Sequence, residues 1–284
     1  MTKALGEATM QVETRVRHGE TPRTLLGEPL VEMSWHMQGE EFLLRGEGEH
    51  YFYYRKGSGI TIDRGASFDA SEESLWLNGS VYAAIASMNG LLPIHASAVA
   101  FQNRVFAFTG AGGAGKSTLV AALGDRGLPM FCDDTLILDL SDPEQILCLP
   151  GHKRLKLRPD ALELTGALRQ EKVSLTVDKY YAQPATGNIG VALPMARLIF
   201  LEDGGGPAIA PIQGAERLTR LQDDHQTTQL FAAARGFSRG EQFGHLVRLA
   251  RQIVMARFQR PRATARFDEG ADLAAGYIMS GGKP

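Results

Sequence analysis

The sequence has little cysteine. Its two cysteines, Cys132 and Cys148, belong to no CxxC pair. Neither a disulfide framework nor a cysteine-ligated zinc site is therefore predicted. A reducing, cytoplasmic environment is the expectation that follows.

Long apolar runs and an excess of charge of one sign are missing as well. No stretch reaches the roughly 18 uninterrupted apolar residues of a membrane helix, and the first twenty residues mix charges without a signal-peptide core. The 30 Lys and Arg nearly balance the 32 Asp and Glu. No overall field therefore favours nucleic acid or an anionic membrane, and we expect a protein that binds neither.

What the sequence does have is apolar residues, at 44% of its 284 positions, enough for a sizeable core. Residues 42–45, 51–55 and 60–63 alternate polar and apolar side chains between glycine-rich turns, which predicts antiparallel strands. Residues 73–88 follow a helical period and end at Asn89-Gly90. We expect a β-rich N-terminal lobe over residues 1–89 and a second domain over residues 90–284.

The second part has a different pattern. Two strands, 95–101 and 105–109, precede a glycine-rich loop, a helix over 116–126 and a short apolar run at 128–132. Strand, loop, helix and strand in this order predict a parallel α/β unit, so the fold class is α/β. Further along, we expect a strand at 196–201 and a helical tract at 244–258 with a buried apolar stripe and a solvated basic face.

The glycine-rich loop is the most specific motif in the chain. It fits GxxxxGK[ST] between a strand and a helix, and its residues are Gly110, Ala111, Gly112, Gly113, Ala114, Gly115, Lys116, Ser117 and Thr118. In such a loop backbone N–H groups surround the β and γ phosphates, the lysine neutralises an oxygen, and the serine ligates magnesium. The motif predicts ATP or another nucleoside triphosphate with Mg2+.

The same glycines also spell GxGxxG, at positions 110, 112 and 115, which would suit a dinucleotide. A dinucleotide site does not need Lys and Ser directly after its last glycine, whereas a triphosphate site does. The triphosphate interpretation is therefore favoured.

Three further residues are candidates for the active edge. Asp133 and Asp134 follow the next predicted strand, where their side chains would point to opposite faces. One would then hold magnesium and the other accept a hydroxyl proton, and the residues alone leave open which does which. His95 begins the hairpin strand that leads into the loop and is a candidate for the same edge.

A basic run at residues 152–158 alternates Lys and Arg with Leu, as an edge strand with one charged face would. Solvation is one explanation of these charges. The other is that Lys153 or Arg154 contacts nucleotide or substrate, since a kinase needs cations near its phosphates.

The segment LPIHASAVAFQNRVFAFTGAGGAGKSTLVAALGDRGLPMFCDDTLIL resembles the core of bacterial HPr serine kinases and, more closely, the HPr-kinase-like enzymes of peptide natural-product clusters, such as those of lasso peptides. The resemblance implies a P-loop kinase core of the HPr kinase and phosphoenolpyruvate carboxykinase type. It implies ATP- and Mg2+-dependent transfer of the γ-phosphoryl group to a serine hydroxyl of a peptide or protein, for instance a ribosomally made peptide precursor. A homo-oligomer is compatible with it.

The resemblance also implies roles for single residues. His95, Lys116 and Asp133 would be catalytic, with the first Asp as the proton acceptor, and Ser117 and Asp134 would hold magnesium. Two departures, Thr118 in place of Glu and the lack of a recognisable ExRGxGI signature, favour a peptide acceptor over HPr itself. The loop alone would equally suit a nucleotide-binding regulator or ATPase without a phosphoacceptor.

Overall fold

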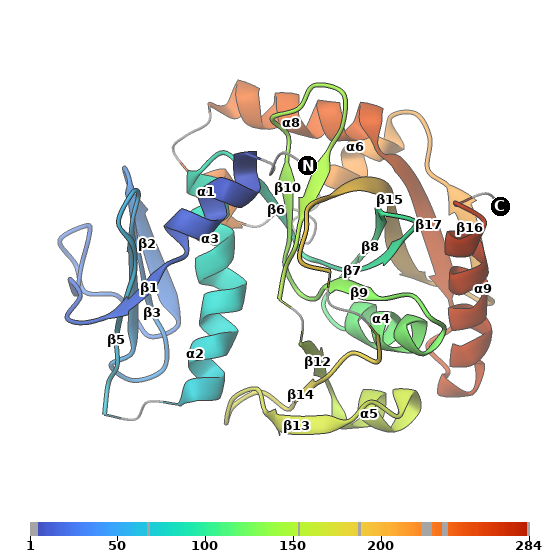
Figure 1. The fold of residues 1–284 in the computed structure, drawn as a ribbon, viewed down its shortest axis with the longest axis horizontal. Coiled ribbons are helices and arrows are strands. Elements are labelled where there is room, and N and C mark those ends of the chain that lie inside the picture. The colour runs from blue at the N-terminus through green and yellow to red at the C-terminus, as the bar shows by residue number, and fades with distance from the viewer. Residues whose placement is uncertain are drawn as a thin grey trace.

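The computed structural model describes residues 5–66, 69–152, 154–186, 189–222, 229–234 and 238–282. They form a mixed α/β fold with three sheets, of five, nine and three strands. The five-stranded sheet lies at one side, and a helical column separates it from the nine-stranded sheet (Figure 1).

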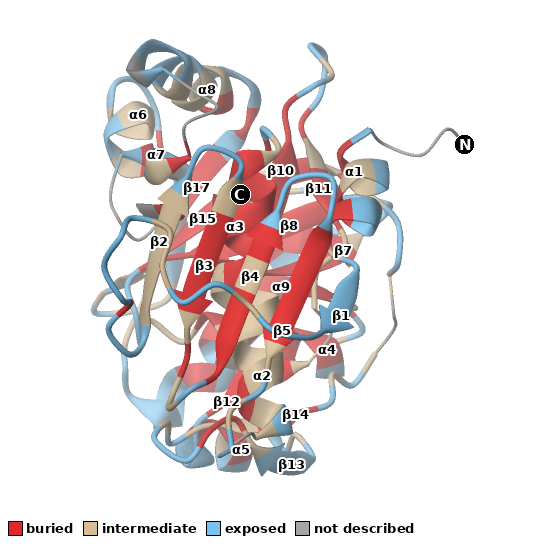
Figure 2. Ribbon diagram, turned by 90° about the vertical axis from the view of Figure 1, so that its left-hand side faces the viewer, coloured by how far each residue is buried: buried red, intermediate tan, exposed pale blue. Residues whose placement is uncertain are grey.

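The first sheet contains the strands predicted between residues 42 and 63, and that prediction is confirmed. Its order is β1-β5-β4-β3-β2, and its strands are β1 (Val16–His18), β2 (Ser34–Gln38), β3 (Glu41–Arg45), β4 (Tyr51–Arg55) and β5 (Gly59–Asp63). Helix α1 (Leu5–Glu13) precedes it. Figure 2 shows how much of β3, β4 and β5 is buried.

A continuous helical column follows, made of α2 (Ala70–Trp76), a π-helical turn η1 (Leu77–Val81) and α3 (Tyr82–Met88). Asp69 caps its start by accepting hydrogen bonds from the Ser71 and Glu72 N–H groups, so the helix begins three residues earlier than predicted. It ends where expected, at Asn89-Gly90. Its apolar side chains share one core cluster with the first sheet and with Ile137 and Leu149 of the second. The division into two domains stays a prediction.

The nine-stranded sheet has the order β6-β10-β11-β15-β8-β7-β9, with β17 beside β15 and β16 beside β17. Its strands are β6 (Leu92–Ile94), β7 (Ala96–Phe101), β8 (Arg104–Thr109), β9 (Met130–Cys132), β10 (Leu136–Asp139), β11 (Leu147–Leu149), β15 (Leu193–Asp203), β16 (Ala208–Pro211) and β17 (Val254–Arg260). Strands β8, β15 and β17 run parallel to one another. Their carboxyl ends therefore lie at the same edge of the sheet.

Helix α4 (Lys116–Asp125) connects β8 to β9, as the strand-loop-helix-strand pattern predicts. The unit is less simple than predicted, because β7 lies between the two strands and is antiparallel to both. Strands β8 and β9 thus run in the same direction without being neighbours. The tight hairpin from β7 into β8 makes β7, rather than β9, the partner of β8.

Helices cover both faces of this sheet. On one face Phe106 and Phe108 of β8 pack with α4 and with α9 (Phe267–Met279). On the other face Val105 and Ala107 share a cluster with side chains of α8 (Arg239–Gln252) and α6 (Glu216–Leu221). Alternate residues of one strand thus serve two cores. The described residues also include the short helices η2 (Thr264–Arg266) and α7 (Gln229–Ala233).

The helix predicted over residues 244–258 is wrong in its second half. Helix α8 ends at Gln252, and the next residues form strand β17. Pairing along the whole of β17, parallel with β15 and antiparallel with β16, outweighs the local helical period.

A small third sheet lies at the end of the molecule near the amino end of α4 (Figure 1). It contains β12 (Leu155–Leu157), β14 (Tyr180–Ala182) and β13 (Arg169–Lys172), with helix α5 (Pro159–Thr165) between β12 and β13. We call these three strands the small sheet. None of the helices in the described part of the chain has the length and apolarity to cross a membrane.

Candidate functional site

The glycine-rich loop connects β8 to α4 and has a backbone that its glycines permit. Gly110, Gly113 and Gly115 all have positive φ angles, of 151°, 79° and 80°. L side chains rarely adopt such angles, so three of the loop's glycines are required by the path of the backbone. The Leu119 N–H donates to the Gly115 carbonyl and starts the helix.

Lys116 folds back over this loop. Its Nζ donates to the carbonyl oxygens of Gly110, at 2.9 Å, and Ala111, at 3.3 Å. The side chain is 7% exposed. Burial lowers the pKa of Lys116 from its ordinary value, against the pull of Asp133 and Asp134.

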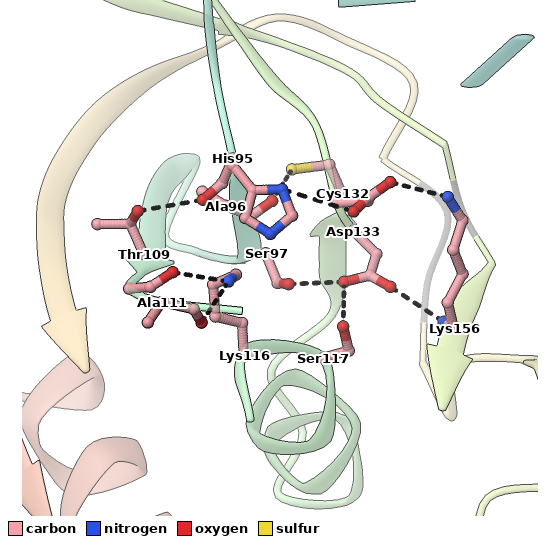
Figure 3. Close-up of polar contacts among 12 residues, drawn as sticks. His95, Ala96, Ser97, Thr109, Ala111, Lys116, Ser117, Cys132, Asp133 and Lys156 are labelled. Carbon is pink, nitrogen blue, oxygen red and sulfur yellow. Dashed lines mark hydrogen bonds and ion pairs between the residues drawn. The ribbon is translucent and has the colours of Figure 1, made fainter. Parts of the chain in front are cut away.

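Asp133 joins three elements at one carboxylate (Figure 3). Its Oδ1 accepts hydrogen bonds from the hydroxyls of Ser97, at 2.6 Å, and Ser117, at 2.8 Å. Its Oδ2 accepts from the backbone N–H of Lys156 at 3.0 Å. Strand β7, helix α4 and the small sheet therefore meet at Asp133, which is 2% exposed.

Asp134 does not point to the opposite face from Asp133, as strand alternation predicted. Strand β9 ends at Cys132, and Asp134 has a positive φ of 71°. This left-handed turn brings its carboxylate to the same side, where Oδ2 lies 2.8 Å from the Lys156 Nζ and Oδ1 lies 3.6 Å from the Nδ1 of His95. Both carboxylates thus face one site.

The charges of this cluster depend on one another. Burial alone would raise the pKa of Asp134, but Lys156 and His95 bring it down to about 2. Burial would lower the pKa of Lys156, but Asp134 raises it above its ordinary value. Burial and the Lys116 ammonium lower the pKa of His95. At neutral pH the structure therefore holds an ionised Asp134, a charged Lys156 and a neutral imidazole.

Arg154 of the basic run does not line the cleft described below. Arg154 turns away from the site, toward Gln170 and Glu171, with its guanidinium over the Tyr181 ring. Lys153 lies outside the described residues. All three residues of β12 are buried, so the expected single charged face is absent from this strand. Lys156 belongs to the same run but was not predicted to contact a ligand, and its ammonium pairs with the Asp134 carboxylate.

A cleft of about 470 Å3 opens beside these groups. Its walls include His95 and Asp134, the loop from Gly112 to Thr118, the last residues of β15, and residues at and after the carboxyl end of β17. Ligands of α/β sheets bind at the carboxyl ends of parallel strands, and a cavity of this size suits a small molecule. Residues 112–118 of the predicted loop, His95 and Asp134 thus border one cavity, and Asp133 accepts hydrogen bonds from Ser97 and Ser117, which also line it.

The cleft is more basic than the chain as a whole, whose formal net charge is -2. Six Lys and Arg side chains line it against four carboxylates. The cations are Lys116, Lys156, Arg158, Lys179, Arg260 and Arg262, and the carboxylates are Asp134, Asp160, Glu202 and Asp203. An anionic ligand is favoured there.

Several of these groups escaped sequence reasoning. Lys179 precedes β14, and Arg260 ends β17 with its guanidinium donating to the Ala114 carbonyl of the loop. Ser97 lies inside the apolar strand β7. The pairing of distant strands brings Lys179 and Arg260 to the loop, so their local sequence carries no signal of it, and Ser97 resembles any small residue of an apolar strand.

Comparison with known proteins places this cleft in context. No family model and no curated protein matches the sequence. Among solved structures, the HPr(Ser) kinase/phosphatase from Coxiella burnetii is similar at 14% sequence identity and a TM-score of 0.35, over 66% of this chain and 88% of that one.

Proposed function

We propose that this chain is an ATP- and Mg2+-dependent kinase with a P-loop core of the HPr kinase and phosphoenolpyruvate carboxykinase type. Its acceptor is a serine hydroxyl of a peptide or protein. The observation that carries the proposal is the convergence of the glycine-rich loop, Lys116, Ser117, both aspartates and His95 around one basic cleft.

The loop fits the phosphates of a nucleotide. A Cβ atom added to Gly112 or Gly113 would meet nothing within 4 Å beyond the neighbouring residues, so the loop has open space on that side. The Lys116 ammonium already lies among the loop's carbonyls, and the loop ends at the amino end of α4. A buried lysine with this geometry supports a triphosphate over a dinucleotide, because a dinucleotide site has no need of the cation.

Ser117 and Asp133 fit a magnesium ion that is shared with phosphates. Magnesium is commonly held by one or two protein oxygens together with phosphate oxygens, and its charge neutralises them when it is bound. The Ser117 hydroxyl and the Asp133 carboxylate already lie 2.8 Å apart. We assign these two residues to magnesium, which reverses the roles of Asp133 and Asp134 that the resemblance implies.

Asp134 is then the proton acceptor. Its carboxylate borders the cleft, whereas the Asp133 carboxylate does not line it and accepts hydrogen bonds from Ser97, Ser117 and the Lys156 N–H. In the transfer, a new bond forms between the serine oxygen and the γ-phosphorus, and the bond from that phosphorus to the β–γ bridging oxygen breaks. The hydroxyl proton passes to Asp134, and ADP leaves. Lys156 and His95 hold the Asp134 carboxylate in place.

A transfer assay tests this function. Wild type, Asp134→Asn and Asp133→Asn would be incubated with γ-labelled ATP, Mg2+ and a panel of synthetic serine peptides, each paired with its serine-to-alanine version. We expect label on serine peptides alone, and a loss of at least about a thousandfold in Asp134→Asn with ADP binding kept. Nucleotide binding without label on any acceptor, in this panel or in proteins of the source cell, would instead support the regulator or ATPase.

A further inference from the structure

Among the residues that the structure describes, the cleft contains one lysine whose side-chain ammonium has no hydrogen bond or ion pair. Lys179 lines the cleft together with Lys116, His95 and Asp134. Its ammonium has no hydrogen-bond or ion-pair partner among the residues that the structure describes, and its side chain is only partly exposed. A long cation that is held at a cleft without a counterion is available for an anionic ligand.

The other cations of the cleft are already engaged. Lys116 binds loop carbonyls, Lys156 binds Asp134, and Arg260 binds the Ala114 carbonyl. In addition, Arg262 pairs with Asp203 at 2.8 Å, and Arg158 lies 3.9 Å from Asp160 with both side chains mostly exposed. Lys179 differs from all of these.

The backbone fixes where the Lys179 side chain begins. Its N–H donates to the Val177 carbonyl at 2.8 Å, and its own carbonyl accepts from the Val173 N–H at 2.9 Å. The same turn is attached to the first part of the chain, because the Thr176 hydroxyl donates to Glu47 at 2.7 Å. The lysine is therefore presented by an ordered turn of the small sheet.

The charge of Lys179 reaches the centre of the site. Its positive charge helps to lower the pKa of His95, Lys116 and Asp134, although burial and other charged groups have larger effects on each pKa. The group that lies between Lys116 and Asp134 in the proposed kinase is the phosphoryl group in transfer, whose oxygens carry the developing charge.

We propose that Lys179 is a catalytic residue that binds the γ-phosphoryl oxygens from the side of the small sheet, opposite Lys116. This inference rests on the proposed function, because it requires a nucleoside triphosphate in the cleft. Lys179 recognises the third phosphate, so it distinguishes ATP from ADP. The β phosphate is left to the loop.

Calorimetric titration with the non-hydrolysable analogue AMP-PNP and with ADP, both with Mg2+, tests this assignment without any acceptor. Lys179→Met is expected to weaken AMP-PNP binding about tenfold or more, the effect of losing one charge-assisted hydrogen bond, while ADP affinity changes less than about twofold. Lys179→Arg keeps the charge and is expected to retain most of the preference.

Lys172→Met is the matched control. Lys172 belongs to the same small sheet, is directed to the Leu175 carbonyl and does not line the cleft. Its replacement should leave both affinities within about twofold of wild type. Equal affinities of Lys179→Met and wild type for AMP-PNP, or an equal loss for AMP-PNP and ADP, would overturn the assignment. A wild type that binds neither nucleotide would instead refute the proposed function, so the two failures are distinguishable.

Discussion

The Ser117 hydroxyl donates to Oδ1 of Asp133 at 2.8 Å, and this bond links the first turn of α4 to the end of β9. The same oxygen accepts from Ser97 of β7 at 2.6 Å. One carboxylate oxygen thus fixes the loop's serine relative to two strands. A metal ligand held in this way needs little rearrangement to bind its ion.

Asp133→Asn should therefore affect the metal dependence of nucleotide binding. We expect the Mg2+ concentration for half-maximal ADP binding to rise about tenfold or more, because the amide is a poorer partner for both Ser117 and the ion. Titration of Mg2+ at fixed ADP measures this, with thermal unfolding to verify that the variant is folded. A shift in Asp134→Asn but not in Asp133→Asn would reverse the assigned roles.

Gly115→Ala should damage the loop more than Gly112→Ala. Gly115 has a φ of 80°, and an added methyl carbon would lie 2.5 Å from Nη2 of Arg260, which contacts the preceding carbonyl. We expect a loss of about 2 kcal/mol of unfolding free energy and at least about tenfold in nucleotide affinity.

Two glycines serve as controls for this substitution. Gly127→Ala introduces a similar backbone strain, at a φ of 82°, where nothing lies within 4 Å, and Gly112→Ala has open space without that strain. Urea unfolding should rank the losses in the order Gly115, Gly127, Gly112. Equal losses for Gly115→Ala and Gly127→Ala would show that the Arg260 contact is unimportant.

The basic run can be dissected by two substitutions. Lys156→Met should leave Asp134 without its ion-pair partner at 2.8 Å and lower the free energy of unfolding by about 2 kcal/mol. This loss is smaller than that for a fully buried ion pair, because the Asp134 side chain is 31% exposed. Arg154→Met should cost less than about 1 kcal/mol, since its pairing with Glu171 is largely at the surface. Chemical denaturation of both variants checks the difference, and a larger loss for Arg154→Met would contradict it.

His152 should make stability sensitive to mild acid. Burial, with Lys156 and Arg154, lowers the pKa of His152 to about 4. The unfolded chain, with a histidine pKa near 6.5, then binds the proton more readily, so stability is complete above about pH 6.5 and falls as pH drops toward 4. His152→Gln should flatten this part of the profile of unfolding free energy against pH. Identical slopes in wild type and variant would refute this.

Local signals predicted much of the site. The hairpin of β7 and β8, the glycine-rich loop and α4 are continuous in sequence, and each has its own periodicity or turn residues. Local signals also placed His95, Lys116 and the Asp pair near one edge. These features are determined by residues that are close together in the sequence, so they can be predicted from the sequence alone.

Long-range pairing accounts for what was missed. The apolar residues of 254–258 continue a helical period, but these residues form strand β17 because they pair with β15 and β16. Lys156 reaches Asp134, and Lys179 reaches the cleft, because the small sheet packs beside α4. The left-handed turn at Asp134 likewise cannot be predicted from the alternation of a strand.

Calorimetric titration of wild type and Lys116→Ala with ATP, ADP and NAD in Mg2+ tests the central claim most directly. Lys116 is the buried cation of the loop, and its Nζ is 2.9 Å from the Gly110 carbonyl. We expect wild type to bind ATP and ADP but not NAD, and Lys116→Ala to lose about a hundredfold in affinity for ATP. Binding of NAD in place of ATP, or unchanged ATP affinity in Lys116→Ala, would contradict it.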